Sequence, residues 1–286
     1  MIGVPARLAL ARALRAPGAR FALTVLLVLG FAAVAAPLLA RQDPAAQPDI
    51  VQAKYLPPSA AHPFGTDAFS RDVFSRVLFG ARVSLGVAVA AVALAMSLGT
   101  LVGAVAGLAG GWVDALLMRV VDALLAVPRL LLVLALVATF GTLSPAGIVL
   151  LLGGTGWPAM SRIVRGEVRS IREREFVLAA RATGVPEWRV LWWHILPAVL
   201  PQMLVAGTLA LAAVIPLEAG LSFLGLGVQP PQASWGNIIL EGADRPAATW
   251  WLLLFPGLAI VATVLAAHSL GERLRDALDP RQLPTA

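Results

Sequence analysis

Cysteine and lysine are nearly missing from this sequence, which contains no cysteine and a single lysine, Lys54. Without cysteine the chain has no disulfide, no thiolate metal site and no thiol nucleophile. An ATP-binding P-loop needs the run Gly-Lys-Ser/Thr, and the one lysine is followed by tyrosine instead. The three histidines share no metal-ligand spacing, and no G-x-S-x-G motif occurs. We therefore expect no catalytic residue, no metal and no cofactor.

Charged residues are scarce as well, at 13% of the chain against about 25% in an average soluble domain. Hydrophobic residues make up 59% of the chain. A single globular domain could not bury so large a hydrophobic fraction away from water. Runs of about 20 apolar residues, each long enough to cross the hydrocarbon of a bilayer, explain the excess. The sequence predicts an all-α integral membrane protein with about six transmembrane helices.

The formal net charge of +6 comes almost entirely from arginine. The arginines lie in loops beside apolar runs and are not interleaved with aromatic residues, which argues against a nucleic-acid partner. In the topology set out below, 16 of the 22 basic residues, Arg129 among them, fall on one side of the membrane. Because positive loops stay in the cytoplasm, we expect a multi-pass protein of the inner or plasma membrane with both termini cytoplasmic.

Residues 1–20 carry four arginines and precede an apolar run at residues 21–40. This pattern resembles a secretory signal peptide, with Ala33-Val34-Ala35 as a cleavage site. The run is long enough to span, however, and further spans follow it. We therefore expect a cytoplasmic tail at 1–20 and an uncleaved first helix within the segment 21–80.

The rest of that segment is polar and contains five prolines between residues 41 and 63, so it should begin as an extended external loop. Apolar and charged residues then alternate at helical spacing from Phe69 to Leu78, with Thr66 or Asp67 as the N-cap. We predict a short amphipathic helix that lies at the outer membrane interface.

A five-helix core is expected at residues 81–270, and its first span is the uncharged run from Val83 to Val113. Gly99, Gly103 and Gly107 stand four apart in this run, a pattern that lets two helix backbones approach closely. Two interpretations are open. The glycines pack against a partner that forms the pore, or they pack against another helix of the same chain.

The uncharged stretch from Leu130 to Ser161 would measure about 48 Å as one helix, too long for a hydrocarbon core of about 30 Å. The run Gly141-Thr142-Leu143-Ser144-Pro145 in its middle is a turn signal. We predict two spans, one reaching back before Pro128 and one ending near Arg162. This division also puts the seven arginines of residues 162–189 in the cytoplasm.

The last two spans are predicted at about residues 201–224 and 250–268, followed by a cytoplasmic tail at 271–286. Trp250 and Trp251 should anchor the sixth span at the interface. Glu218 is the acid that falls within a span, which makes it a candidate for a gate or a proton site. The alternative is a structural hydrogen bond to a neighbouring helix near the outer end of the span.

The loop between the fourth and fifth spans, about residues 165–197, contains helix signals that a solvated linker would not need. Residues 168–182 are helix formers of mixed charge, and Gly184 fits a helix C-terminus. Pro186 and Glu187 fit the first turn of a second helix, which Pro197 would end. Small and apolar residues occupy the elbow, where another protein could approach closely. We predict a helix–turn–helix hairpin on the cytoplasmic face.

This hairpin resembles the EAA loop of ABC-importer permeases in Leu178-Ala179-Ala180, then Gly184, then His194-Ile195-Leu196-Pro197. Other motifs resemble the dipeptide/oligopeptide/nickel permease family, and its C-type permease most closely, over about residues 20–282. These motifs are His62-Pro63-Phe64-Gly65-Thr66-Asp67, Arg71-Asp72, Gly111-Trp112-Val113-Asp114, Leu221 to Gly227, and Leu274 to Arg281.

The resemblance implies a type I ABC-importer (MetI-like) permease core plus an N-terminal helix. It implies four kinds of partner: a homologous second permease in a heterodimer, two ATP-binding subunits that hydrolyse ATP, an extracellular solute-binding protein, and the membrane lipid. The loop would dock into the ATPases through Phe176, Leu178, Ala179, Ala180, Arg181, Ala182, Gly184, Val185 and Pro186. Leu178 stands where the family usually has glutamate, so a charged contact is missing there, and Ser70 stands where glycine is common.

On this interpretation the chain forms half of a translocation pathway for peptides or a related small solute such as nickel, and the sequence does not determine which. Two other classes remain as alternatives. A secondary transporter would use an ion gradient and no ATPase, and a structural membrane protein would move nothing. Co-purification with an ATPase would distinguish the ABC-importer permease from both the secondary transporter and the structural protein.

Overall fold

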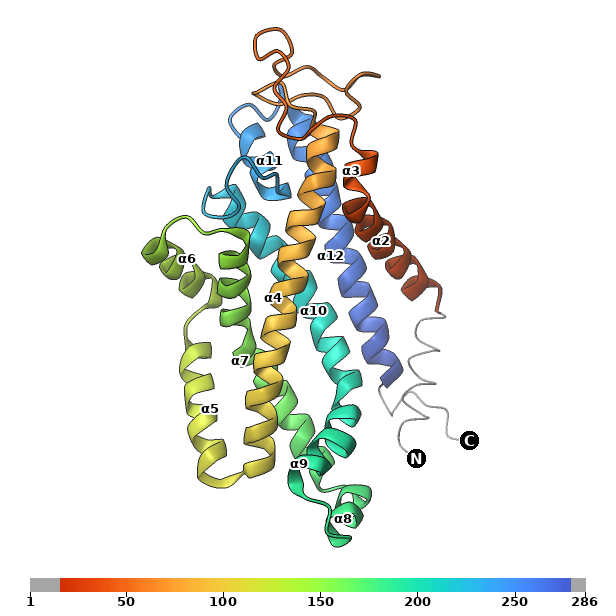
Figure 1. Ribbon diagram of the computed structural model, residues 1–286, viewed down its shortest axis with the longest axis vertical. Helices are drawn as coiled ribbons and strands as arrows, with labels where there is room; N and C mark the ends of the chain where they lie inside the picture. Colours follow the sequence, from red (N-terminus) through yellow and green to blue (C-terminus); the bar gives the residue numbers. More distant parts are fainter. Residues whose placement is uncertain (1–15, 279–286) are drawn as a thin grey trace.

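The computed structural model describes residues 16–278, most of which are helical (Figure 1). Five helices are long and apolar enough to cross a membrane, and a bent pair counts as a sixth span. The described residues contain no β-strand, only an isolated bridge between Thr66 and Asp72. The all-α membrane fold is therefore confirmed. The spans are α2 (Pro17–Val34), α4 (Val73–Ala109), the pair α5 (Gly111–Ala126) and α6 (Arg129–Phe140), α7 (Pro145–Arg172), Glu187–Phe223, and α12 (Trp250–Leu278).

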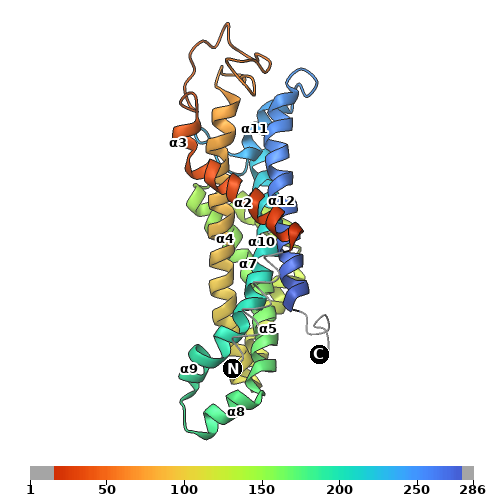
Figure 2. The same ribbon diagram turned by 90° about the vertical axis from the view of Figure 1, so that its right-hand side faces the viewer.

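The first span lies at the edge of the bundle against α12 (Figure 2). Small residues let the two helices approach, because Ala19 and Ala22 are buried with Leu270 and Leu274 of α12. The short helix α3 (Ala36–Leu39) continues the span toward the loop of residues 41–72. Three of the arginines predicted to precede this span lie outside the described residues, namely Arg7, Arg12 and Arg15.

Helix α4 runs without a break for 37 residues, about 55 Å, and so extends well beyond the hydrocarbon core. The separate amphipathic helix predicted at residues 69–78 is wrong, since from Val73 onward these residues are the first turns of α4. The N-cap is Asp72, whose carboxylate accepts the Ser75 N–H at 2.8 Å. Thr66 and Asp67 lie in the preceding loop, which folds back so that Thr66 pairs with Asp72.

The turn predicted at residues 141–145 is confirmed. Helix α6 ends at Phe140, Gly141 follows with a φ of +74°, and α7 starts at Pro145 with Ser144 as its N-cap. The span before this turn is broken, because α5 and α6 meet at an angle of 83°. The break falls at residues 127–128, where a proline cannot donate the helical hydrogen bond. Arg129, counted above among the cytoplasmic residues, is instead the first residue of α6.

Helix α7 extends to Arg172, well past the end predicted near Arg162. A break at residues 173–174 separates it from α8 (Glu175–Ala182), so the helix predicted at 168–182 is divided between two elements. After the next turn, α9 (Glu187–Val190), the π-helical turn η1 (Leu191–Ile195) and α10 (Leu196–Phe223) follow one another directly.

The prediction that Pro197 ends the second helix is wrong. Pro197 lies in the first turn of α10, and the helix continues past it to Phe223. Pro197 lacks the N–H that would donate to the preceding turn, but it lies just after η1, and the chain stays helical from Glu187 through it. The π turn before it also shifts the hydrogen-bond register of the backbone.

Helix α11 (Trp235–Gly242) packs against α10 and α12 near the start of α4. Trp235 is fully buried, and its indole N–H donates to the Val77 carbonyl at 3.1 Å. Trp250 is 46% exposed, as an interfacial anchor should be, but Trp251 is 3% exposed and donates to the Thr66 carbonyl at 3.0 Å. Helix α12 reaches Leu278, so the first half of the tail predicted at 271–286 is still helical.

Candidate functional site

The hairpin of residues 165–197 lies at one end of the elongated bundle, opposite the loop of residues 41–72 (Figures 1 and 2). The end of α7 leads into it, α8 forms its tip, and α9 and η1 lead back to α10. The predicted pair of short helices joined by a tight turn is therefore present, with the changed boundaries given above.

Helix α8 ends in a Schellman motif. Gly184 has a φ of +78° and donates its N–H to the Arg181 carbonyl at 2.9 Å, while the Val185 N–H donates to the Ala180 carbonyl at 3.2 Å. No atom lies within 4 Å of the position that a Gly184 Cβ would take. Glycine is thus required here for its backbone conformation and not for lack of space. The prediction that Gly184 terminates a helix is confirmed.

Arg181 holds the two arms of this turn together. Its Nε and Nη2 donate to the two carboxylate oxygens of Glu187 at 2.8 and 2.9 Å. Its Nη1 donates to the carbonyl of Arg172, the last residue of α7, at 3.3 Å. Such a two-point contact fixes orientation as well as distance. The sequence analysis placed Arg181 in a contact with another protein and missed this pair, whose six-residue spacing is not a helical one.

An apolar cluster fills the inside of the hairpin and determines which predicted docking residues face outward. Val168, Val177 and Val190 are completely buried in it. Among the predicted docking residues, Phe176, Ala180 and Val185 pack against this cluster and so are directed inward at least in part. The exposed members of the predicted set are Leu178, Ala179, Ala182, Gly184 and Pro186.

Apolar side chains are conspicuous on the outer surface of the hairpin. Leu178 is 50% exposed and Trp188 is 59% exposed, and the guanidinium of Arg189 lies 5.1 Å from the Trp188 ring centroid. Clusters of exposed apolar side chains of this kind mark surfaces that another protein or a membrane covers.

The glycines of α4 face α7, the helix that carries the hairpin. A Cβ at Gly103 would lie 2.5 Å from the Ser161 carbonyl oxygen, and one at Gly107 would lie 2.8 Å from the Val168 Cβ. At Gly99 a Cβ would collide with Met160. The three glycines therefore pack against another helix of the same chain, which is the second of the two interpretations left open by the sequence. Because the two helices approach closely over the more than two helical turns from Gly99 to Gly107, α4 and α7 form one packed pair.

Charged contacts extend this pairing toward the hairpin. Arg165 donates from Nε and Nη2 to the two carboxylate oxygens of Asp114, at 2.5 and 2.6 Å. Arg172 donates from Nη1 to the Gly107 carbonyl at 2.8 Å. These bonds connect the last turns of α7, which lead into the hairpin, to the junction of α4 and α5.

Comparison with known proteins identifies this arrangement. Residues 99–283 match the family described as binding-protein-dependent transport system inner membrane component. The chain belongs to this family.

Relatives named as permeases extend the match to nearly the whole chain. A putative peptide transport system permease of Brucella suis is 41% identical over 280 residues, which cover 97% of this chain and 92% of the relative. A putative peptide permease of the same organism is 44% identical over 277 residues, 94% and 89% of the two chains. The dipeptide transport system permease DppC of Alkalihalophilus pseudofirmus is 42% identical over 224 residues, 78% and 73% of the two chains.

Glu218 of this permease is fully buried near the C-terminal end of α10. One carboxylate oxygen accepts the Ser222 hydroxyl at 2.9 Å, within the same helix, and the other has no hydrogen-bond partner among residues 16–278. Ser84 of the neighbouring helix α4 lies beside the same carboxylate, so the expected contact with another helix stands together with the bond inside α10. The side chain borders no exposed surface of this chain, and a role as a gate or proton site stays a prediction.

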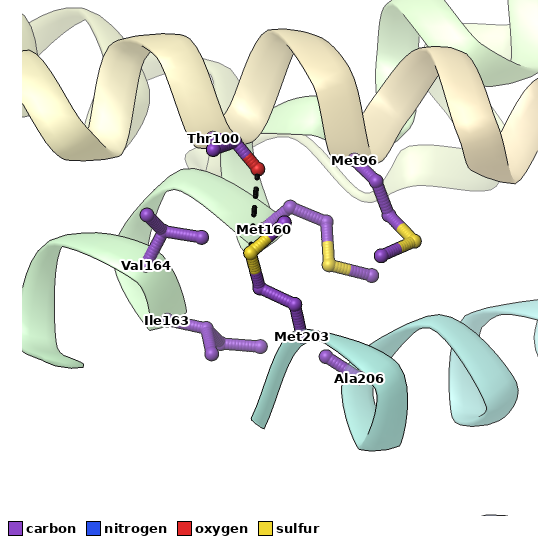
Figure 3. Close-up of a pocket in the computed structure, with 7 residues that line it drawn as sticks. All are labelled: Met96, Thr100, Met160, Ile163, Val164, Met203 and Ala206. Atoms are coloured by element: carbon purple, nitrogen blue, oxygen red, sulfur yellow. Dashed lines mark hydrogen bonds between the residues drawn. The ribbon is translucent and has the colours of Figure 1, made fainter. Parts of the chain in front are cut away.

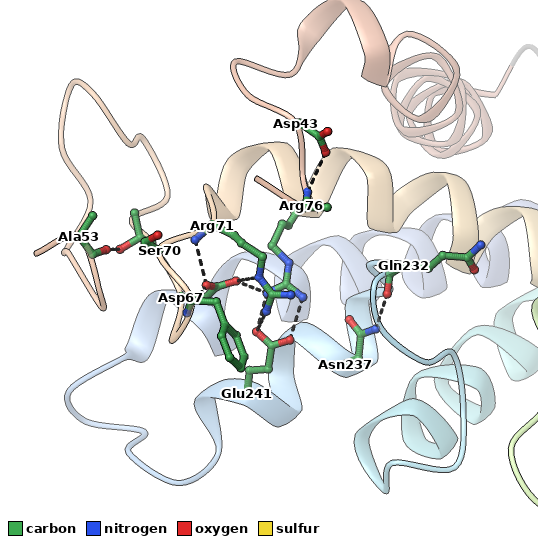
Figure 4. Close-up of polar contacts among 12 residues, drawn as sticks. Asp43, Ala53, Asp67, Ser70, Arg71, Arg76, Gln232, Asn237 and Glu241 are labelled. Atoms are coloured by element: carbon green, nitrogen blue, oxygen red, sulfur yellow. Dashed lines mark hydrogen bonds and ion pairs between the residues drawn. The ribbon is translucent and has the colours of Figure 1, made fainter. Parts of the chain in front are cut away.

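Four charged side chains meet at the end of the permease opposite the hairpin, and of these only Asp67 was given a role from the sequence, as a possible N-cap. Figure 4 shows their contacts. Arg71 donates to Asp67 at 2.7 Å and to Glu241 at 2.9 Å. Arg76 donates to Glu241 at 2.8 Å and also contacts Asp67. The two cations and two anions are largely buried, so their charges balance in a site with little water.

This network joins the loop of residues 41–72 and the start of α4 to α11, which is about 165 residues further along the chain. The signal in the sequence was the density of charge at residues 67–76 of an otherwise apolar protein, but nothing local indicates Glu241. Ser70 has a φ of +60° in the same loop, a conformation that glycine adopts without strain. The glycine that the resemblance leads one to expect at this position would adopt this conformation more easily than serine does.

A small apolar pocket lies where α4, α7 and α10 meet (Figure 3). Met96, Met160 and Met203 line it, and the Thr100 hydroxyl contacts the Met203 sulfur at 3.8 Å. The lining contains no charged group. Elsewhere in residues 16–278, no group of three or more His, Cys, Asp or Glu side chains is placed to hold a metal ion.

Proposed function

We propose that this permease forms half of the translocation pathway of an ATP-driven importer of dipeptides or oligopeptides. The observation that carries the proposal is the rigid hairpin with exposed small and apolar residues, in a chain that belongs to a binding-protein-dependent transport family. Identities of 41–44% to proteins named as peptide or dipeptide permeases support peptides as the substrate class. Nickel is the alternative that the sequence resemblance also allows.

The partners follow from the same hypothesis. A homologous permease would complete the pathway, two ATP-binding subunits would hydrolyse ATP, and a solute-binding protein would deliver the peptide from outside. The hairpin would lie in the cytoplasm, together with both termini. Support for this orientation comes from the arginines concentrated in and around the hairpin, since positive segments stay inside.

In the proposed mechanism the ATP-binding subunits bind α8 and move it when ATP binding brings these subunits together. The Schellman turn and the Arg181–Glu187 pair make α8 and α9 move as one piece. The packed pair of α4 and α7 then carries the motion through the membrane and switches the pathway between outward and inward access. The energy enters as the different affinity of the ATPases for the two states of the permease.

Single cysteines test the contact directly, because the chain has no cysteine of its own. A cysteine in place of Ala182, which is exposed on α8, should form a crosslink with an ATP-binding subunit in the assembled transporter. A cysteine in place of Val177, which is fully buried in the same helix, is the matched control and should not. Labelling of the Ala182→Cys variant from outside intact cells would refute the orientation.

Transport assays distinguish an ATP-driven importer from an ion-driven carrier. Gly184→Arg strains the turn and adds a bulky cation to the exposed elbow, so ATP-dependent peptide uptake in proteoliposomes should be lost. Leu178→Glu restores the residue usual in the family and should preserve uptake and the crosslink. If Gly184→Arg transported normally while an uncoupler abolished uptake, an ion-driven carrier would be the better account.

A further inference from the structure

Arg129 occupies an unusual place for a charged residue. It is the first residue of α6, directly after the break at which α5 and α6 turn by 83°. The break lies about half way along the neighbouring helix α4 (Figure 1). The Nη2 atom of Arg129 would lie 3.1 Å from a Cβ at Gly156, and that Cβ would lie 3.2 Å from Ala95 of α4.

Ala95 locates this guanidinium near the middle of the bilayer. It lies 12 residues after Val83, where the uncharged part of α4 begins, and 14 residues before Ala109, the last residue of α4, so about 18–21 Å of uncharged helix lies on either side. Arg129 is only partly buried at this depth. An arginine there cannot face lipid without a cost of about 2.5–3.5 kcal/mol or more, so it faces protein or water.

No carboxylate of residues 16–278 neutralises Arg129. Its Nη2 donates to the Leu152 carbonyl at 2.7 Å and its Nε approaches the Thr155 hydroxyl at 3.5 Å, both on α7. No acidic side chain lies within 4.0 Å in the described part of the chain, in contrast to Arg71, Arg76 and Arg165. A guanidinium has five N–H donors, so donors remain for a further anion.

The break between α5 and α6 indicates independently that the side of these helices around Arg129 does not face lipid. Backbone groups freed at a helix break cannot be left in lipid, and such breaks occur where they are buried in protein or line a water-filled cavity. The residues around the break are exposed in this chain, with Val127 at 44% and Leu130 at 51%. The charge and the break therefore both require that something other than lipid covers this side of α5 and α6.

We propose that Arg129 lines the translocation pathway and binds the carboxylate of the passing peptide. The proposal rests on peptide import as the function. A planar guanidinium with two free donors matches the two oxygens of a carboxylate, which every peptide with a free C-terminus carries. The same charge repels a bare divalent cation, so it favours peptide over nickel as the cargo of this pathway.

Cysteine accessibility tests the location. In the assembled transporter, Arg129→Cys should react with an anionic, membrane-impermeant methanethiosulfonate reagent in at least one nucleotide state, and transported dipeptide should slow the reaction. Leu27→Cys is the lipid-facing control, since Leu27 is 62% exposed on α2 at the far edge of the bundle, and it should not react. Absence of labelling at residue 129 in both the nucleotide-free and the ATP-trapped state would overturn the proposal, as would labelling that peptide does not slow.

Transport measurements test the role of the charge. Arg129→Gln should lower dipeptide uptake per ATP hydrolysed by roughly tenfold or more, because it removes a charged hydrogen bond to the substrate. Arg129→Lys keeps the charge without the planar fork and should fall between Gln and wild type. Parallel losses of thermal stability in both variants, with unchanged uptake per hydrolysed ATP, would show that Arg129 only fastens α6 to α7. If the wild-type transporter moved no peptide at all, the proposed function would fail, whereas labelling of residue 129 would still report a water-lined face.

Discussion

Replacing Gly103 by alanine tests whether α4 and the hairpin-bearing helix α7 act as one unit. The added Cβ would lie 2.5 Å from the Ser161 carbonyl oxygen and 2.9 Å from the Val164 Cβ, whereas favourable contacts between heavy atoms lie at about 3.5–4.0 Å. A helix carbonyl cannot rotate out of the way, so the two helices must separate by about 1 Å. Overpacking of this kind costs about 1–3 kcal/mol.

Gly86 offers a matched control on the same helix, because no atom lies within 4 Å of its Cβ position. Gly86→Ala should leave stability unchanged or raise it by up to about 1 kcal/mol, the difference in helix propensity. Gly103→Ala should lower the midpoint of thermal unfolding of the purified permease complex by several degrees, at about 2–4 °C per kcal/mol. It should also lower the peptide taken up per ATP hydrolysed, because the displaced α7 carries the hairpin. Equal midpoints and equal coupling in the two variants would refute the reasoning.

Two further predictions concern the ends of the bundle. Arg76→Ala leaves Arg71 as the one buried cation beside the two carboxylates of Asp67 and Glu241, so one negative charge is uncompensated. This variant should lower the free energy of unfolding by about 3–5 kcal/mol, while Arg82→Ala, at an exposed arginine on the same helix, should lower it little. Arg181→Ala should change the unfolding midpoint only slightly, because its ion pair with Glu187 is partly exposed and worth about 1 kcal/mol or less. Amide exchange at residues 183–187 should nevertheless rise in that variant relative to an alanine at the exposed Arg174, and unchanged exchange would show that Arg181 does not hold the turn.

The spans and the hairpin were predictable because their signals are local. An apolar run of sufficient length must cross the bilayer as a helix, whatever surrounds it. The turn at residues 141–145 and the helix end at Gly184 each follow from the backbone preferences of the residues at those positions. Boundaries were less predictable, since α4, α7 and α12 all extend beyond their apolar runs, where packing and not hydropathy sustains the helix.

Contacts between distant residues depended on the folded bundle. Three glycines at a spacing of four indicate a close helix neighbour, but the spacing is the same whether that neighbour belongs to this chain or to another. Arg71 and Arg76 meet Glu241 across about 165 residues, and no local pattern encodes that meeting. Arg129 stands beside an apolar run and so resembles a loop residue in the sequence. Its depth in the membrane depends on the direction in which α6 leaves Pro128, and that direction is set by packing against α7.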